Sequence, residues 1–337
     1  MKTTIVLDAM GSDKRPQPEV EASVQCAETL GVDLILVGDE AVLKPLLAAR
    51  PGDKTHVRIA HAPEALEMSD HIAEARAKRN NTMQVGMDLV RSGAAQAFVT
   101  AGNTGMAMYF ATKTFGLIPG VIRPSLCTTF PVKNGKCVVL DIGANAECRP
   151  EFLVQFGRMG SVYARLLLGR DQIRVGLLAN GEEEGKGNEL VKAAGPLMRA
   201  EVPGFVGNIE GKELFAGEVD VAVTDGFTGN ILLKSTEAVS RLILETLKEE
   251  LLRSTRTKLG AALAKPAFNS VKQMIDPSEI GAAPLLGIDA LVFVGHGRSD
   301  AKAVLSAVNQ AKIAVESGLL DSLRQSIPSD NSGESHS

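Results

Sequence analysis

The chain has no tryptophan and only two tyrosines in 337 residues, and aromatic residues make up 4% of it. With 45% hydrophobic residues, it is expected to form a compact α/β protein with a large aliphatic core. The four cysteines show no CxxC motif and no paired spacing, which argues against a disulfide framework and favours a reducing cytoplasm. We find no signal peptide before the first apolar run and no run long enough to span a membrane.

An excess of positive charge is also lacking. The 36 Lys and Arg residues are outnumbered by 40 Asp and Glu residues, so the net charge of −4 gives no general footprint for nucleic acid, and we expect no nucleic-acid partner. The five histidines form no HxxxH or Cys/His cluster, so no metal site is predicted. GxSxG is absent, and no glycine-rich turn has the third glycine of the dinucleotide motif GxGxxG.

Short apolar runs alternate with helical periodicities along the chain. This alternation is typical of repeated βα units around a mostly parallel sheet. Residues 1–325 are predicted to form one two-lobed α/β domain, and residues 326–337, which are polar and rich in serine, a disordered tail. The first helix is expected from Pro16 to Leu30. Strands are expected at residues 4–7, 34–37, 57–60, 97–100, 137–140, 175–178, 219–223 and 291–294.

Polar, glycine-rich turns follow six of these strands. In an open parallel sheet the carboxyl ends of the strands share one edge, and ligands bind in the crevice outside them. We therefore predict that the six turns converge on one cleft. The turns are DAMGSD from Asp8, AGNTG from Ala101, DIGAN from Asp141, ANGEEEGKGNE from Ala179, TDGFTGN from Thr224 and GHGRSD from Gly295.

The turn within LLANGEEEGKGNEL, residues 177–190, has the pattern of an anion site. Gly185 and Gly187 flank Lys186, and a helix is expected to open near Asn188, so backbone N–H groups and a positive helix end would meet a phosphate there. The spacing is not that of a Walker A loop, and an ordinary strand-to-helix turn with a solvated acidic run is an equally weighted alternative. The role of the three glutamates at 182–184 stays open, and a Mg²⁺ site there would need more ligands than the sequence supplies.

The six turns offer hydrogen-bond donors and isolated charges in place of a nucleophile with its base. Cys26, Cys127 and Cys137 fit apolar packing positions. Cys148 is the only cysteine in a turn, and we predict that it is not a nucleophile because only Arg149 beside it would lower a thiol pKa. A site of this composition suits binding of a phosphate anion and polarisation of a carbonyl by preorganised donors.

These motifs resemble the PlsX family of bacterial phosphate acyltransferases, in the family order and over nearly the whole chain. CRPEFLVQF, GNIEGKEL, NILLK, GAAPLLG and GHGRSDAKA add to the six turns. The departures are local: Ser12 stands where the family motif DAMGGD has glycine, DPSEIGAAPLLG replaces a stretch closer to DYSEYGGAPLLG, and Arg298 and Asp300 replace smaller or neutral residues. They concern substrate contacts rather than family membership.

The resemblance implies a fold, a reaction and partners. The expected fold is a Rossmann-like α/β/α sandwich, similar to that of isopropylmalate and isocitrate dehydrogenases and of phosphotransacetylases, in a homodimer without a cofactor. The expected reaction is transfer of a fatty acyl group from acyl carrier protein to inorganic phosphate, giving acyl phosphate for membrane phospholipid synthesis. Bound phosphate would attack the thioester directly, since a thiolate, whose thiol has a pKa of about 8.5, leaves without a dedicated general acid.

The site residues follow from the motifs and this reaction. Lys186 is assigned the phosphate charge, and Asn230 and Asn103 the carbonyl or phosphate oxygens. Asp225 is expected to orient Lys186 or Asn230, and His296 either contacts substrate or caps its own turn. The predicted substrate-binding residues are Asp8, Gly11, Gly102, Thr104, Gly105, Asn145, Gly185, Gly187, Asn188, Gly229 and His296.

Residues 251–275 form a basic segment in an acidic chain, without any carboxylate. Leu259 and Leu263 share a helical face before Pro266, and further apolar residues follow it, so the segment is predicted to be a helical hairpin that projects from the body. The helix before it, 235–252, is expected to face the core. The hairpin either packs on itself or on a second subunit, or it contacts an anionic membrane or acyl carrier protein. The predicted contact residues are Arg253, Arg256, Lys258, Leu259, Leu263, Lys265 and Lys272.

Three other functions stay open at this point. A related acyltransferase would use another thioester, as phosphotransacetylases do. A dehydrogenase of the same fold would need a nucleotide site. A non-catalytic membrane or carrier-protein adaptor would keep the basic surface without a cleft.

Overall fold

One large sheet organises the protein. The computed structural model describes residues 2–133, 135–275 and 281–327. In this part of the chain eleven strands form one sheet in the order β3-β2-β1-β4-β11-β10-β5-β6-β9-β7-β8. The strands are β1 (Thr4–Asp8), β2 (Asp33–Gly38), β3 (Val57–His61), β4 (Ala97–Thr100), β5 (Ser125–Val132), β6 (Gly135–Leu140), β7 (Val175–Leu178), β8 (Phe205–Ile209), β9 (Val221–Val223), β10 (Ala282–Leu286) and β11 (Leu291–Gly295).

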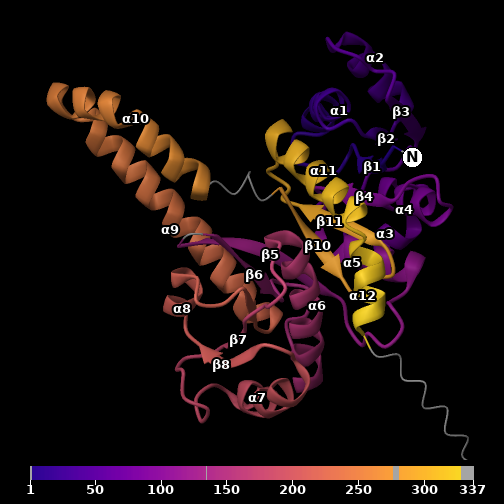
Figure 1. Ribbon diagram of the computed structural model, residues 1–337. Helices are drawn as coiled ribbons and strands as arrows, with labels where there is room; N and C mark the ends of the chain where they lie inside the picture. Colours follow the sequence, from indigo (N-terminus) through magenta and orange to yellow (C-terminus); the bar gives the residue numbers. More distant parts are fainter. Residues whose placement is uncertain (1, 134, 276–280, 328–337) are drawn as a thin grey trace, which may run out of the picture.

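Helices cover both faces of the sheet (Figure 1). The helices are α1 (Gln17–Thr29), α2 (Glu40–Ala49), α3 (Ile72–Ala77), α4 (Thr82–Arg91), α5 (Thr104–Phe115), α6 (Pro150–Leu168), α7 (Glu189–Glu201), α8 (Gly211–Ala216), α9 (Gly226–Leu252), α10 (Thr255–Ile275), α11 (Ala301–Glu316) and α12 (Leu319–Ser326). All eight expected strands and the first expected helix are confirmed within two residues. The strands β5, β8 and β10 were not expected; β5 and β10 each contain a proline, which argues against a strand when only the sequence is read.

Successive residues of a strand point to opposite faces of the sheet, and this alternation produces two cores. In β1, Ile5 belongs to the core on the face of the sheet covered by α1, α6 and α11, and Val6 to the core on the face covered by α4 and α5. Both residues are fully buried, and each buried side chain of this size contributes roughly 1.5 to 3 kcal/mol. The predicted α/β/α sandwich with a mostly parallel sheet is therefore confirmed.

The direction of the strands changes in the middle of the sheet. The pairs β11·β10, β10·β5 and β5·β6 are antiparallel, whereas all other neighbours are parallel. Three antiparallel pairings in succession reverse the strand direction. The block of β1, β2, β3, β4 and β11 therefore runs opposite to the block of β6, β7, β8 and β9. The prediction that six strand ends share one edge is wrong for this reason: β1, β4 and β11 end at one edge, and β6, β7 and β9 end at the other.

The helices α9 and α10 project from the body as an antiparallel pair (Figure 1). A projecting hairpin was expected, but its two arms are α9 and α10, joined at Arg253 and Ser254. Pro266 lies inside α10 and does not break it. The expectation that residues 235–252 face the core is wrong, because the outer part of α9 leaves the body; Val239 and Leu242 are exposed. Among the described helices, none combines the length and hydropathy of a membrane-spanning segment.

The first two residues of the predicted tail belong to the folded body. Ser326 is the last residue of α12, and the side chain of Ile327 is buried in the core that contains α6 and α11. The remainder of the predicted tail, residues 328–337, lies outside the described residues, as do residues 276–280 of the stretch that departs from the PlsX motif.

Candidate active site

A cleft of about 720 Å³ lies where the two blocks of strands meet. The strands β5 and β10 contribute Leu126, Thr128 and Ala283 to its lining, and α9 contributes one of its own faces. The turn after β4 lines one part of the cleft, the turn after β11 another, and the turn after β6 enters from the opposite block. The other lining residues are Met68, Gly102, Asn103, Thr104, Gly105, Ile142, Gly143, Asn230, Leu233, Lys234, Glu237, Arg241, Gly281, Ala282, Val294, Gly295, His296, Gly297, Arg298, Ser299 and Ala303.

The amino terminus of α5 lies at this cleft. Asn103 is the N-cap: its Oδ1 accepts a hydrogen bond from the backbone N–H of Met106 at 3.1 Å. Thr104 and Gly105 form the first turn of the helix and line the cleft. The first N–H groups of a helix and the positive end of its dipole favour an anion, so this end of α5 is suited to phosphate or to a polarised carbonyl oxygen.

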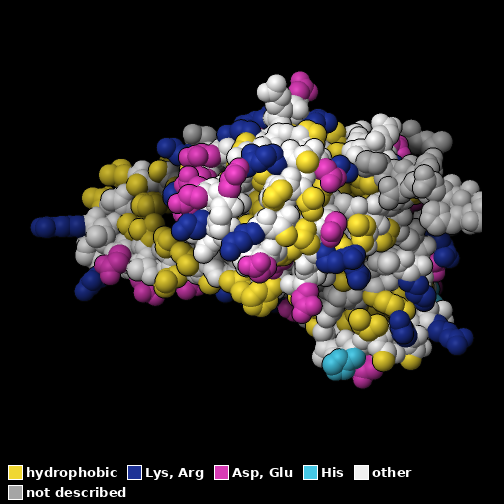
Figure 2. Space-filling model, turned by 90° about the horizontal axis from the view of Figure 1, so that it is seen from below, with side chains coloured by type: hydrophobic (Ala, Val, Ile, Leu, Met, Phe, Trp, Pro, Cys, Tyr) yellow, Lys and Arg dark blue, Asp and Glu magenta, His cyan; other side chains and the backbone are white. Residues whose placement is uncertain are grey.

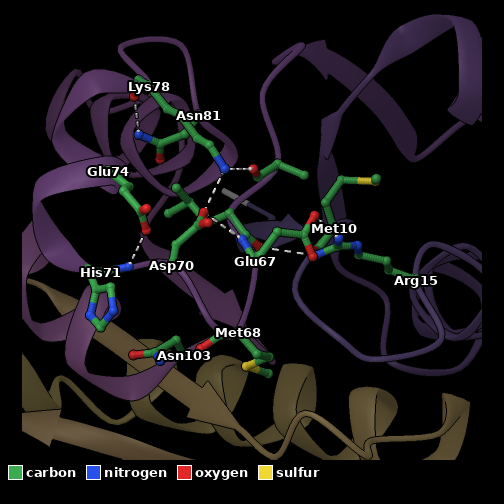
Figure 3. Close-up of polar contacts among 12 residues, drawn as sticks. Met10, Arg15, Glu67, Met68, Asp70, His71, Glu74, Lys78, Asn81 and Asn103 are labelled. Carbon is green, nitrogen blue, oxygen red and sulfur yellow. Dashed lines mark hydrogen bonds and ion pairs between the residues drawn. The ribbon is translucent and has the colours of Figure 1, made fainter.

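The loop between β3 and α3 contacts the side chain of Asn103. The Nδ2 of Asn103 donates to the carbonyl oxygen of Met68 at 3.1 Å. Arg15 donates to the carbonyl oxygen of Leu66 at 3.0 Å and pairs with Glu67, whereas Lys78 pairs with Asp70 on the other side (Figure 3). This loop therefore reaches the cleft with Met68 and is fixed by cations at both of its ends.

Asp8 and Gly11, two predicted site residues, lie behind the cleft lining. The Asp8 carboxylate accepts a hydrogen bond from the Thr100 hydroxyl at 2.7 Å, and the Thr100 oxygen in turn accepts the N–H of Gly102 at 3.0 Å. Burial raises the pKa of Asp8, and the Thr100 hydrogen bond opposes that change. A Cβ atom on Gly11 would lie 2.9 Å from the backbone nitrogen of Gly102. Both residues therefore support the turn after β4 and do not line the cleft.

Asp141 organises the turn after β6 and was not assigned a role from the sequence. Its buried carboxylate accepts hydrogen bonds from the backbone N–H groups of Leu126, Gly143, Ala144 and Asn145. The Asn145 side chain donates to the same carboxylate and to the carbonyl oxygen of Pro124, both at 2.8 Å. Asn145 thus braces the turn, which presents Gly143 to the cleft opposite Asn230.

One face of α9 brings polar side chains into the cleft. Asn230, Lys234, Glu237 and Arg241 follow one another at intervals of three or four residues, so they share a helical face. The N-cap Asp225 accepts hydrogen bonds from the N–H and hydroxyl of Thr228, and not from Lys186 or Asn230 as we expected. The sequence interpretation missed Lys234, Glu237 and Arg241, although their helical spacing from Asn230 was a usable signal.

His296 joins this helical face from the turn after β11. Its Nε2 lies 3.0 Å from the Nζ of Lys234 and 3.2 Å from the Oε1 of Glu237. The hydrogen bond to His296, followed by the charges of His296 and Lys234, lowers the pKa of Glu237 although burial opposes this. The backbone carbonyl of His296 accepts the N–H of Ser299, so its side chain is not what closes the turn.

The turn with Lys186 lies outside the lining of this cleft. The strand β7 pairs with β9, so the turn leaves the sheet at the same edge as the start of α9, and Lys186 is exposed. Neither Gly185 nor Gly187 lines the cleft, and the N–H of Gly187 donates to the side chain of Asn180 at 2.9 Å. Asn188 is the N-cap of α7.

Two of the three glutamates in this turn have cationic partners. Glu182 pairs with Lys212 at 2.7 Å, and Glu184 pairs with Arg199. Their charges are thus partly balanced by neighbouring elements. Among the described residues, no group of three or more His, Cys, Asp or Glu side chains is arranged to hold a metal ion.

Known proteins that are similar to this chain over nearly its whole length point to one family. A family model described as fatty acid synthesis protein matches residues 3–321. A phosphate acyltransferase of Thermus thermophilus is 45% identical over 95% of this chain and 97% of its own length. One of Elusimicrobium minutum is 44% identical over 96% of this chain and 95% of its own length.

Solved structures show the same fold at low sequence identity. A phosphotransacetylase from Streptococcus pyogenes matches with a TM-score of 0.63 at 14% identity, covering 93% of this chain and 94% of its own. The EutD phosphotransacetylase of Staphylococcus aureus matches with a TM-score of 0.59 at 18% identity and the same coverage. The structural likeness establishes the fold, and the curated relatives establish the family: this chain belongs to the PlsX family of phosphate acyltransferases.

Proposed function

We propose that this phosphate acyltransferase transfers a fatty acyl group from acyl carrier protein to inorganic phosphate, and that the acyl phosphate serves membrane phospholipid synthesis. The observation that supports this most directly is the cleft, in which the amino terminus of α5 and the polar face of α9 surround one volume. It combines an anion-binding helix end with apolar lining from Leu126, Ile142 and Leu233, as a phosphate and an acyl chain together require.

In the proposed mechanism a phosphate oxygen attacks the carbonyl carbon of the thioester. The C–O bond forms, the C–S bond breaks, and the thiolate leaves and takes a proton from solvent. Asn103 and Asn230 both line the cleft and are proposed to hold the carbonyl or phosphate oxygens. Fixed donors lower the barrier because they are already oriented toward the developing charge. Lys186 is proposed to add positive charge from the neighbouring turn.

We propose further that the hairpin α9–α10 brings this chemistry to an anionic membrane or to a second subunit. Hydrophobic side chains gather along the projecting arm, and Lys or Arg side chains stand at its outer end (Figure 2). Leu259 is 67% and Leu263 79% exposed, which is unusual for a stable apolar face left in water. The basic residues of 251–275 would add attraction to anionic lipid.

The experiment for the reaction measures free thiol released from acyl carrier protein thioesters, with and without inorganic phosphate. Thiol release that depends on phosphate, with acyl phosphate as product, supports the proposal. Equal rates on the matching acyl coenzyme A thioester would favour a phosphotransacetylase-like substrate instead. An adaptor without catalysis would release no thiol in either case, and an NAD-dependent rise in melting temperature would point to the dehydrogenase alternative.

A further inference from the structure

Three side chains in the cleft form a linked cluster that the motifs did not assign as a unit. Lys234 and Glu237 lie one turn apart on α9, and their side chains approach to 3.4 Å. His296 reaches both from the turn after β11. We propose that Lys234 is the cation that holds inorganic phosphate inside the cleft, and that Glu237 and His296 position its ammonium group. This inference rests on the proposed reaction and names the phosphate ligand within it.

The position of Lys234 on α9 fits this role. It follows Asn230 by one helical turn, about 6 Å along the helix axis, and Asn230 faces Gly143 on the opposite strand block. The side chain of Lys234 is 49% exposed, so an anion in the cleft can reach it. Arg241 lies two turns further along α9, about 10 Å from Lys234 along the axis, and is thus closer to the outer end of the cleft.

The contacts of Lys234 leave one of its protons for a ligand. An ammonium group donates three hydrogen bonds. In this structure the Lys234 Nζ has Glu237 Oε2 and His296 Nε2 as partners, at 3.4 and 3.0 Å. Among the described residues these are the contacts of the nitrogen, and the side chain is half exposed, so a third N–H remains for a phosphate oxygen. A lysine held in this way loses less side-chain entropy on binding than a freely rotating one.

The carboxylate of Glu237 is suited to hold the ammonium in place. Its side chain is only 14% exposed, and the hydrogen bond from His296 favours its ionised form. A charge in such a partly buried position acts more strongly on a neighbouring cation than it would in water. Glu237 is therefore a positioning residue that acts through Lys234 and touches no substrate in this proposal.

The histidine nitrogen has one hydrogen-bond role at a time. Without a proton, Nε2 accepts from Lys234; with a proton, it donates to Glu237. In the first arrangement His296 helps to orient the ammonium group, and in the second it holds the Glu237 carboxylate that pairs with Lys234. Other charged groups that line the same cleft are Arg241 and Arg298.

The test compares the phosphate dependence of variants with intact thioester binding. We expect Lys234→Ala to lower kcat/KM for phosphate by about 100-fold, the scale for removing a preorganised charged group. The KM for the acyl carrier protein thioester should stay within about twofold of wild type, because Lys234 is proposed to contact phosphate alone. A general defect of the site would instead raise the KM of both substrates. Glu237→Gln should raise the phosphate KM about tenfold at nearly unchanged kcat, and Lys234→Arg should restore part of the lost activity.

A second measurement does not depend on turnover. Inorganic phosphate should raise the melting temperature of the wild-type protein, and this rise should disappear in Lys234→Ala. The matched controls are Glu245→Gln and Lys248→Ala, which have the same three-residue spacing on an exposed part of α9.

The outcomes separate the two proposals. If wild type releases no phosphate-dependent thiol, the proposed reaction fails whatever the variants do. If wild type is active and folded Lys234→Ala keeps both the phosphate KM and the phosphate-dependent rise in melting temperature, Lys234 is not the phosphate ligand. If Glu237→Gln changes the two substrate KM values equally, or only the melting temperature in the absence of phosphate, its role is structural.

Discussion

Gly229 packs directly against Asp141: a Cβ atom on Gly229 would lie 1.9 Å from the carbonyl oxygen of Asp141. The first turn of α9 and the turn after β6 therefore approach each other so closely that no side chain fits between them at this position. This contact sets the position of Asn230, the next residue of α9, relative to Gly143 in the cleft.

Gly229→Ala should displace α9 and disturb the site. We expect a loss of about 1 to 3 kcal/mol in the free energy of unfolding, the scale for inserting a methyl group into a packed contact, together with reduced activity. Urea denaturation and the thiol-release rate measure the two effects. Gly260→Ala in α10 is the control, because nothing lies within 4 Å of its Cβ position and alanine favours a helix. Equal stability of the two variants would contradict the inferred contact.

Glu19 should make stability depend on pH near neutrality. Its side chain is fully buried on α1, and burial raises its pKa from 4.5 to about 7. The folded protein thus binds this proton more tightly than the unfolded chain does, so unfolding releases a proton between pH 4.5 and 7 and stability falls as the pH rises through that interval. The full cost, on the order of 3 kcal/mol, applies above pH 7.

Glu19→Gln should remove this pH dependence while keeping an oxygen that accepts the N–H of Ser12. The measurement is the difference between the unfolding free energies of wild type and variant at pH 5 and pH 8. Using this difference removes the part of the pH dependence that Asp8, whose pKa is also raised by burial, contributes equally to both proteins. We expect the variant to gain relative stability at pH 8; a difference that is the same at both pH values would show that Glu19 does not titrate in this interval.

Lys186→Ala should raise the phosphate requirement or lower turnover by about 10² or more, with little change in folding, if the lysine contributes charge to the phosphate site. Its exposure predicts that the variant folds normally. Lys192→Ala, an exposed lysine on the adjoining α7, is the matched control. Normal phosphate dependence of a folded Lys186→Ala protein would show that the positive charge that binds phosphate comes from the cleft and not from Lys186.

Cys148→Ser should keep activity. The thiol is partly buried, and burial, with the nearby charges of Asp141 and Asp225, raises its pKa to about 11, so almost no thiolate exists at neutral pH. Its Sγ lies 3.5 Å from the carbonyl oxygen of Asn145, which makes it part of the turn after β6. Mass spectrometry of protein quenched during turnover should find no acyl group on this residue; an acyl-cysteine at 148 would require a two-step mechanism.

Leu259→Glu together with Leu263→Glu should abolish attachment to anionic vesicles while activity on soluble substrate persists. The wild-type protein is expected to sediment with anionic but not with neutral vesicles and to be released by high salt, because the attraction to basic residues is screened. Val206→Glu, an exposed apolar position on β8, is the control. If the double variant unfolds or becomes monomeric, the hairpin is a packing element and the membrane proposal fails.

The sequence by itself determined the layers of the fold and the identity of the turns. Apolar runs such as Ile5 to Leu7 are typical of a strand buried on both faces, and the glycines and Asn or Asp residues that follow mark helix starts through local hydrogen bonds. Asn103, Asn188 and Asp225 all became N-caps because that role depends on the next three residues alone. The order of the family motifs is likewise a property of the sequence alone.

Only the tertiary structure decided which turns meet. The antiparallel strands β5 and β10 reverse half of the sheet, and no local pattern reports the direction of a strand relative to its neighbours. For the same reason Asp8 lies behind the cleft and Lys186 lies outside its lining. Lys234 and Glu237 line the cleft because they lie on the face of α9 that is turned toward it. His296 meets those two residues across about 60 positions of sequence, and such a contact exists only once the sheet has placed the turn after β11 beside α9.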